Sequence, residues 1–199
     1  MTPKENMPLK QYPSVRDATE AERIGMVKDI FRTIIRRYDF LNHVLSLGRD
    51  IAWRRFAVRQ MHPFLTNGRT NRFLDVACGT GDLAIEAAGR YPHLSVTGLD
   101  FVKEMMDEAA RKTRGRGLAS RIAFVHGDAT ALPFADNSFD ATGIAFGIRN
   151  IPDRMGTLKE MLRVVVPGGQ VMVLEITPPQ GVLVKKLYLL IGLGFIWPT

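Results

Sequence analysis

Residues 75–82 are the part of this chain best suited to binding a small molecule. They read Asp-Val-Ala-Cys-Gly-Thr-Gly-Asp, begin inside the strand expected at 73–77 and lead into a helical pattern. Gly79 and Gly81 allow the backbone to turn tightly and to approach a ligand closely. The start of the helix adds N–H groups that have no partner within the helix. The pattern predicts a ligand site where the first strand of an α/β sheet ends, with Asp75 among the residues that bind the ligand.

A carboxylate follows each of the next two predicted strands. Asp100 ends the second strand, 19 residues after Gly81. There it can accept hydrogen bonds from both ribose hydroxyls of a bound nucleoside. Asp128 follows the third strand in the triplet Gly-Asp-Ala, where its side chain can meet the amino group of an adenine. The loop and Asp100 alone are also compatible with NAD.

Three details favour S-adenosylmethionine (SAM) over a dinucleotide. The loop lacks the third glycine of the dinucleotide fingerprint Gly-x-Gly-x-x-Gly. Asp82, directly after the loop, would sit poorly against a pyrophosphate but suits a cationic sulfonium or amino group. Asp128 supplies the adenine contact. The structural alternative is a glycine turn with ordinary helix-capping aspartates, and we interpret Cys78 as a small residue of that turn.

Strands and helices alternate from residue 73 onward. Strands are expected at 73–77, 95–99, 122–126, 139–146 and 170–176, and helices at 82–90, 103–113 and 153–163. This alternation predicts a parallel sheet with right-handed crossovers, and the short apolar strands suit a sheet covered on both faces. The predicted fold class is a doubly wound α/β domain, the Rossmann-like fold of class I SAM-dependent methyltransferases, over residues 73–199.

Residues 1–72 are expected to form an N-terminal helical cap and basic segment. An apolar stripe runs through 20–38, and a second helix is expected to bury Trp53, Phe56, Ala57 and Met61. This third of the chain has 14 Lys and Arg against 7 Asp and Glu, whereas the remainder has 13 of each, so it holds the whole net charge of +7. We predict contact with an anionic membrane surface through Arg54, Arg55 and Arg59; a solvated helix surface is equally compatible.

Composition excludes several other classes of protein. The single cysteine cannot form an internal disulfide, and no Cys/His cluster has the spacing of metal ligands, so we expect no metal. The N-terminus has no apolar stretch typical of a secretory signal, and the apolar tail at 187–197 is too short to span a bilayer. No aromatic-basic motif indicates nucleic-acid binding. These features predict a cytoplasmic protein, peripheral at the membrane.

Longer stretches identify a family. The run 75–82, then Leu-Pro-Phe-Ala-Asp-Asn-Ser-Phe-Asp at 132–140 and Phe-Gly-Ile-Arg-Asn at 146–150, resembles the quinone C-methyltransferases of ubiquinone and menaquinone synthesis. Two more segments resemble that family's signatures: Tyr-Asp-Phe-Leu-Asn-His-Val-Leu-Ser at 38–46, with Trp53 downstream, and Arg-Val-Val-Val-Pro-Gly-Gly-Gln-Val-Met-Val-Leu-Glu-Ile-Thr at 163–177. The resemblance runs from about Ile24 to Thr177.

The resemblance implies a cofactor site, a substrate and catalytic residues. SAM would contact Thr80, Asp100, Asp128 and Ala129, while Gly79 and Gly81 form the backbone cradle. The methyl acceptor would be a demethylquinol with a lipid tail, either demethylmenaquinol or a ubiquinone precursor. From their position after the fourth strand, at the open edge of the cleft, we expect Arg149 and Asn150 to face the quinol oxygens, with Arg149 stabilising the phenolate. Tyr38 and Asn42 would close over the ring, although a purely structural role suits them equally.

The chain also departs from the family pattern. Ala145 stands where the family has a serine on the SAM side of the pocket, and Asp50 replaces a usual histidine. The family normally continues for about 50 more residues, so we expect a C-terminally incomplete domain of five strands in the order 3-2-1-4-5. Its fifth strand would be an edge, covered by the tail or by a partner in a homo-oligomer. The alternatives are a non-catalytic SAM-binding or partner-stabilising homologue and a methyltransferase with another small-molecule acceptor.

Overall fold

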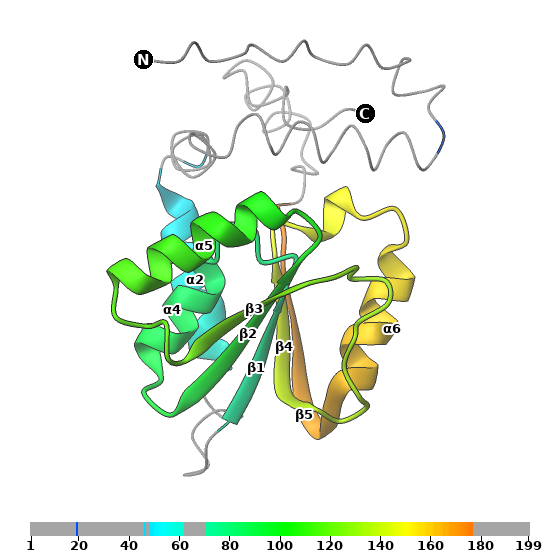
Figure 1. The fold of residues 1–199 in the computed structure, drawn as a ribbon. Helices are drawn as coiled ribbons and strands as arrows, with labels where there is room; N and C mark the ends of the chain where they lie inside the picture. Colours follow the sequence, from blue (N-terminus) through cyan, green and yellow to red (C-terminus); the bar gives the residue numbers. More distant parts are fainter. Residues whose placement is uncertain (1–18, 20–45, 47, 62–70, 177–199) are drawn as a thin grey trace, which may run out of the picture.

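A computed structural model describes residues 19, 46, 48–61 and 71–176 of the chain. The expected helix at 20–38, Tyr38, Asn42 and the apolar tail lie outside these residues. Figure 1 shows the elements in chain order. They are α2 (Arg49–Gln60), β1 (Asn71–Val76), α4 (Asp82–Arg90), β2 (Leu94–Asp100), α5 (Lys103–Gly115), β3 (Ile122–His126), β4 (Phe139–Ala145), the 3-10 helix η1 (Ile148–Asn150), α6 (Arg154–Val164) and β5 (Val165–Leu174).

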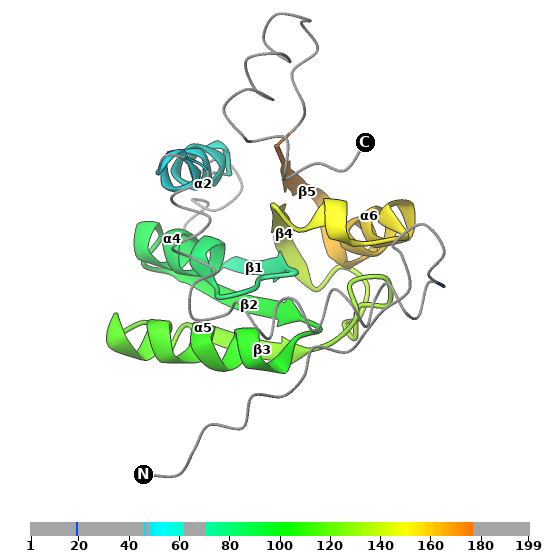
Figure 2. The same cartoon turned by 90° about the horizontal axis from the view of Figure 1, so that it is seen from above.

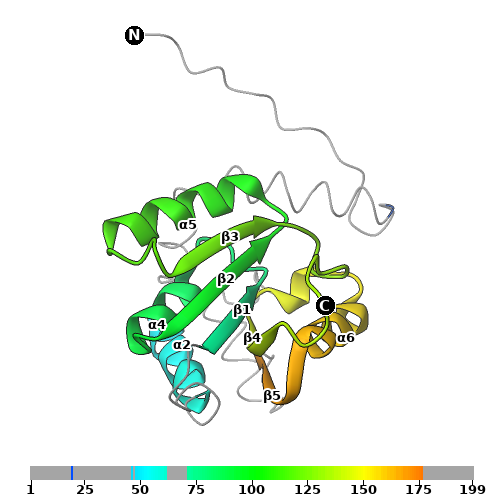
Figure 3. The same ribbon diagram turned by 60° about the horizontal axis from the view of Figure 1, so that its bottom comes forward.

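The five strands form one parallel sheet in the order β3-β2-β1-β4-β5, as the sequence predicts. Figure 3 shows β1 inside the sheet, with β2 and β4 on either side of it. Asp75 of β1 is level with Gly98 of β2 and with Gly143 of β4. Because the strands are parallel, the loops after β1, β2 and β4 all leave the same edge, and this edge is where the pocket described below forms.

Helices cover both faces of the sheet (Figures 1 and 2). On one face, α2 and α4 pack on a cluster that includes Phe73, Leu94, Val96 and Met172. On the other face, α6 packs on a second cluster that includes Leu74. Successive β1 residues thus point to opposite faces and are all buried from Phe73 to Val76. This two-sided burial explains why apolar residues occupy adjacent positions, Phe73 and Leu74, instead of alternating with exposed polar ones.

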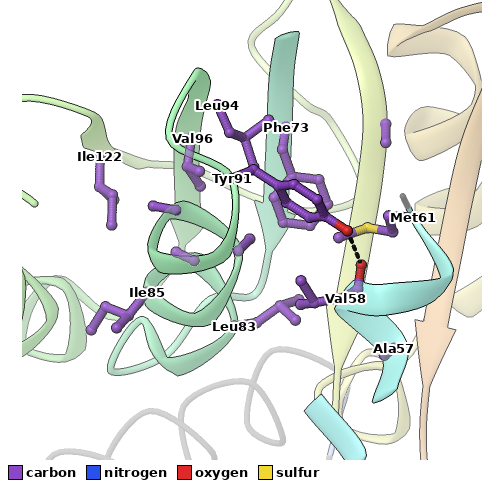
Figure 4. Packing of buried hydrophobic residues seen from close by; sticks show 14 of the residues in the cluster. Ala57, Val58, Met61, Phe73, Leu83, Ile85, Tyr91, Leu94, Val96 and Ile122 are labelled. Carbon is purple, nitrogen blue, oxygen red and sulfur yellow. Dashed lines mark hydrogen bonds between the residues drawn. The ribbon is translucent and has the colours of Figure 1, made fainter. Parts of the chain in front are cut away.

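The buried face of α2 differs from the expected one. The expectation that Phe56 faces inward is wrong, because its side chain is 63% exposed and Trp53 is only half-buried. Ala57 and Met61 are buried as expected, and the helix also buries Asp50, Arg54 and Val58, spaced from Ala57 by one, three or seven positions along one face. Figure 4 shows the hydroxyl of Tyr91, which donates a hydrogen bond to the carbonyl of Val58, 3.0 Å away, and so links the helix to the end of α4.

The start of β5 is also earlier than expected. The strand pairs with β4 from Val165, which is level with Phe139, whereas Ala141 is level with Gln170. Between these two pairs, one residue of β4 stands against four of β5, so β5 has three extra residues there; Gly168, within this stretch, has φ +79°. The sequence Pro-Gly-Gly indicates a turn before the strand. In the structure, β5 pairs with β4 both before this segment, at Val165, and after it, from Gln170.

Three expectations about the whole chain stay predictions. The boundary between residues 72 and 73 is one of them, although α2 packs directly on α4. A partner covering the edge of β5 is another, and C-terminal incompleteness is the third. Among the described residues, no helix has both the length and the apolar character needed to cross a membrane.

Candidate active site

A pocket of about 490 Å³ lies at the edge of the sheet where β1, β2 and β4 end. Its volume is within the range of small-molecule and cofactor sites, about 300–1,000 Å³. The predicted cofactor residues converge on it: its wall includes Asp75, Gly79, Thr80, Asp100, Asp128 and Ala129. Gly81, the remaining member of that set, is buried behind the wall. The residues that the sequence analysis assigned to the cofactor thus lie together at one site in the structure. Their individual contacts with a ligand stay predictions.

The loop after β1 has the backbone shape that its glycines allow. Gly79 and Gly81 have φ +54° and +79°, and Ala77 also has a positive φ, 51°. The N–H of Cys78 donates to the carbonyl of Leu99, which ties the loop to β2. A Cβ added at Gly79 would meet no atom within 4 Å, so its backbone faces open space in the pocket wall. This geometry is a cradle into which a ligand can approach the main chain closely.

Asp100 is the carboxylate that the loop holds in place. One of its oxygens accepts from the N–H of Gly79 at 2.8 Å and the other from the N–H of Val102 at 2.9 Å. Burial raises the pKa of this carboxyl group, and these hydrogen bonds counteract part of that effect. Each oxygen has a second lone pair. A ribose diol could therefore bind without displacing the backbone donors.

Asp75 lies deeper, at the base of the pocket. Its side chain is 1% exposed and accepts a hydrogen bond from the N–H of Ala84 at 3.0 Å. Burial raises its pKa from 3.8 to about 8, and the neighbouring carboxylate of Asp100 adds to this rise. The carboxyl group is therefore largely protonated at neutral pH when no cation is bound.

The raised pKa of Asp75 predicts a pH dependence of stability that the change Asp75→Asn removes. A carboxyl group whose pKa is higher in the folded than in the unfolded state favours folding while it is protonated. As the pH rises from about 4 to about 8, the wild type should lose free energy of unfolding relative to the variant, and the difference should level off above pH 8. Urea unfolding of both proteins across pH 4–9 measures this. Parallel curves would contradict the prediction.

Asp82 and Thr80 are held by a cation from α5. Lys112 Nζ donates to the hydroxyl of Thr80 at 3.1 Å and forms an ion pair with Asp82. A second cation, Arg54 of α2, lies 3.7 Å from Asp82. Asp82 thus faces two cations of the protein itself, which reduces the negative charge it presents to a sulfonium. Sequence reasoning missed Lys112, because nothing in the sequence indicates that α5 reaches this loop.

Asp128 and Ala129 form the opposite end of the pocket. Asp128 is exposed, and one of its oxygens accepts from the N–H and the hydroxyl of Thr130, both at 2.8 Å. These hydrogen bonds fix the direction of the carboxylate after β3. Ala129 is buried in the wall beside it. Across the sheet, the pocket thus extends from the end of β3 to the end of β4.

The residues after β4 make up the other side. Ala145 and Phe146 line the pocket, and Phe146 has φ +58°, a strained backbone for an aromatic residue. Asn150 also lines the pocket, as the prediction requires. Arg149 does not, because its guanidinium forms an ion pair with Glu175. A contact between Arg149 and a substrate would therefore need a change of rotamer, and its catalytic role stays a prediction, as does that of Tyr38.

Arg54 is the residue of the pocket whose place the sequence analysis misassigned. The expectation that it lies with Arg55 and Arg59 on a basic surface is wrong, because its side chain is buried and lines the pocket. Asp50, four residues earlier, forms an ion pair with it at 2.7 Å. The sequence does contain a signal for this placement. Asp50 stands four residues before Arg54, and two residues at that spacing lie on the same face of a helix, where an acid and an arginine can pair. Cys78 also lines the pocket, and burial raises the pKa of its thiol well above the ordinary value.

The pocket suits SAM in charge and shape. The carboxylate of Asp100 favours a cation, and the open backbone at Gly79 gives the ligand a place to approach the main chain. Asp100 and Asp128 lie where a ribose and an adenine would follow each other along the edge of the sheet. The fold and the site define a class, the Rossmann-like methyltransferases that use SAM.

Residues 16–196 match the ubiE/COQ5 methyltransferase family, and the chain belongs to this family. The resemblance seen in the sequence is therefore confirmed, and the chain is a methyltransferase with SAM as its cofactor.

Relatives and solved structures agree with this class. The chain is 50% identical to a ubiquinone/menaquinone biosynthesis C-methyltransferase UbiE of Geotalea daltonii, over 84% of this chain and 70% of the relative. It is 45% identical to a demethylmenaquinone methyltransferase of Deinococcus radiodurans, over 87% and 68%. A structure from Methanococcus maripaludis, described as a SAM-dependent methyltransferase, has the same fold, with TM-score 0.58 and 18% identity over 95% of this chain and 78% of that one. So does a SAM-dependent methyltransferase from Geobacter sulfurreducens solved with S-adenosylhomocysteine, with TM-score 0.51 and 22% identity over 63% and 51%.

Proposed function

We propose that this chain methylates a ring carbon of a demethylquinol with an isoprenoid tail. The observation that carries the proposal is the family match over 16–196, together with relatives at 45–50% identity whose names specify quinone methylation. The pocket supports it, because its β4 side combines a polar group with apolar surface. Asn150 lies there with Phe146, Ile151 and Pro152, a combination suited to a ring that has oxygens at its edge.

The chain's own residues would bind and orient the two reactants. SAM, when bound, supplies an electrophilic methyl group. Asn150 can form a hydrogen bond with a ring hydroxyl. This contact would orient the neighbouring ring carbon toward the methyl group of SAM. Arg149, if released from Glu175, would stabilise the phenolate oxygen, and it stays protonated at ordinary pH. The proton of the methylated carbon would leave through water.

An assay with the purified full chain tests the proposal. SAM is supplied with demethylmenaquinol or with the benzoquinol precursor of ubiquinone, and mass spectrometry detects a quinone that has gained one methyl group. Methylation of either ring supports the proposal and selects the acceptor. Binding of SAM without methylation of either ring would contradict it and favour a non-catalytic homologue. Quinones from cells with and without the gene, compared for the loss of one methyl group, give an independent measurement.

We also propose that α2 brings the enzyme to the membrane where a lipid-tailed quinol resides. Arg55 and Arg59 are exposed on this helix, and Arg55 lines an open groove with Arg90 and Arg116. Arginines clustered in this way attract anionic headgroups, at about 1 kcal/mol for each residue near the surface. The charge reversal Arg55→Glu with Arg59→Glu should reduce co-sedimentation with vesicles that contain phosphatidylglycerol.

The matched control for this experiment is the same double reversal on α5, at Arg111 and Arg114, which are exposed as well. It should leave most of the vesicle binding intact. Equal binding by the wild type and the α2 variant would overturn the proposal, and so would equal losses in both variants, because α2 would then have no specific role. Neither result bears on the methyl transfer itself.

A further inference from the structure

The side chain of Arg54 places a full positive charge in the wall of the cofactor pocket. It is 11% exposed and extends from α2 toward the loop after β1. Its Nη1 lies 2.7 Å from Asp50 Oδ2 and 3.7 Å from Asp82 Oδ2, and its Cζ lies 5.3 Å from the ring centroid of Phe146. Three segments of the chain, α2, the start of α4 and the exit of β4, thus meet at this guanidinium. Figure 3 shows α2 beside α4.

Such a charge is costly to bury unless its surroundings compensate it. Asp50 does so directly, and Asp50 itself accepts a hydrogen bond from the hydroxyl of Ser46 at 2.8 Å. Asp82, on the other side, is shared with Lys112. The cluster therefore contains two acids and two bases. A guanidinium has five N–H donors in a planar fork, and the hydrogen bond to Asp50 engages Nη1, so the fork can also donate toward the pocket.

The position of Arg54 along the pocket indicates which part of SAM it faces. Asp128 and Asp100 occupy the β3 and β2 ends, the side assigned to the adenine and the ribose. Arg54 stands over Phe146, after β4, on the opposite side. If a nucleoside binds at Asp100 and Asp128, the methionine that it carries would extend toward the β4 side of the pocket, where Arg54 lies.

The charges of the pocket distinguish the two ends of that methionine. The wall contains the carboxylates of Asp100 and Asp82, which suit the ammonium and the sulfonium, although Lys112 and Arg54 offset part of the charge of Asp82. The carboxylate is the one anionic group of SAM and would be repelled by them. Among the described residues that line the pocket, Arg54 is the only arginine or lysine. Its planar fork can bind a carboxylate with two parallel hydrogen bonds.

We propose that Arg54 binds the methionine carboxylate of SAM, and that Asp50 and Asp82 orient its guanidinium for that purpose. The N-terminal helix α2 then completes the cofactor site, instead of only covering the domain. The inference concerns the cofactor, so it holds whichever acceptor receives the methyl group.

The test compares SAM with decarboxylated SAM, which keeps the sulfonium and the ammonium but lacks the carboxylate. Calorimetric titration of the full wild-type chain should show tighter binding of SAM. The change Arg54→Gln should weaken SAM binding roughly 10- to 100-fold, the range expected for a lost hydrogen bond to a charged group. It should leave the affinity for decarboxylated SAM unchanged. The matched control is Arg55→Gln, the next residue of the same helix, whose side chain is 58% exposed; it should leave both affinities unchanged.

Each other outcome is also decisive. Equal losses for both ligands in Arg54→Gln would assign Arg54 a structural role and overturn the proposal, and so would no loss for either. If this variant does not fold, Arg54→Lys takes its place, because lysine keeps the charge without the fork. A loss confined to SAM would again support the proposal, and a shared or absent loss would overturn it. A wild type that binds neither ligand would contradict the cofactor assignment itself.

Discussion

Asp100→Asn is expected to weaken the binding of SAM by roughly 10- to 100-fold, which corresponds to a lost hydrogen bond to a charged group. The carboxylate is 5% exposed, and its two oxygens accept from the N–H groups of Gly79 and Val102. An asparagine offers one acceptor oxygen, so its amino group must face either a backbone donor or the ribose. Calorimetric titration with SAM measures the loss. The effect should be larger than that of any exposed substitution, because both the ligand contact and the cradle depend on this one side chain.

The matched control is Asp107→Asn, the same chemical change on the exposed surface of α5. Asp107 is paired with Lys103 in water, and its side chain is 64% exposed. Such surface pairs contribute little, so this variant should bind SAM as the wild type does. An Asp100→Asn protein that folds and binds SAM with wild-type affinity would show that the pocket grips the ligand elsewhere.

Phe73→Ala is expected to lower the free energy of unfolding by about 3–5 kcal/mol, the range for removing a buried aromatic ring. Phe73 lies on β1 and has no exposed surface. Its ring occupies the space over Gly143 of the neighbouring strand, where an added Cβ would lie only 2.8 Å from Phe73 Cζ. Alanine would leave a cavity between the sheet and its helices. Urea unfolding at constant pH measures the change.

Phe56→Ala provides the control, because Phe56 is a phenylalanine with an exposed side chain on α2. Its loss should change the free energy of unfolding by no more than about 0.5 kcal/mol. A similar effect of the two substitutions would mean that α2 buries a different face from the one described here. A loss below about 1 kcal/mol for Phe73→Ala would mean that the cluster collapses around the missing ring.

The sequence by itself determined the class of fold and the cofactor side of the site. Helices and strands alternate with short apolar runs, and that periodicity is a local property which the chain keeps when it folds. The bounds of α4 and β3 were predicted to the residue. Glycines in a turn and an acid at the end of the next strand also act locally, because parallel strands necessarily bring their carboxyl ends to one edge. The proximity of Asp100 and Gly79 therefore follows from the sequence alone.

Only the tertiary structure decided which charges meet across elements. Arg54, Asp82 and Lys112 come from α2, α4 and α5, and their contacts depend on how these helices pack and rotate on the sheet. In the sequence of α2, Arg54 stands near two arginines that are exposed in the structure, Arg55 and Arg59. Successive residues point about 100° apart around a helix, so the orientation of α2 on the sheet decides which arginine enters the pocket and which stays on the surface. Arg149 shows the same limit, because its place after β4 was predictable but its partner Glu175 was not. Side-chain pairing between distant segments is set by packing, which no local pattern records.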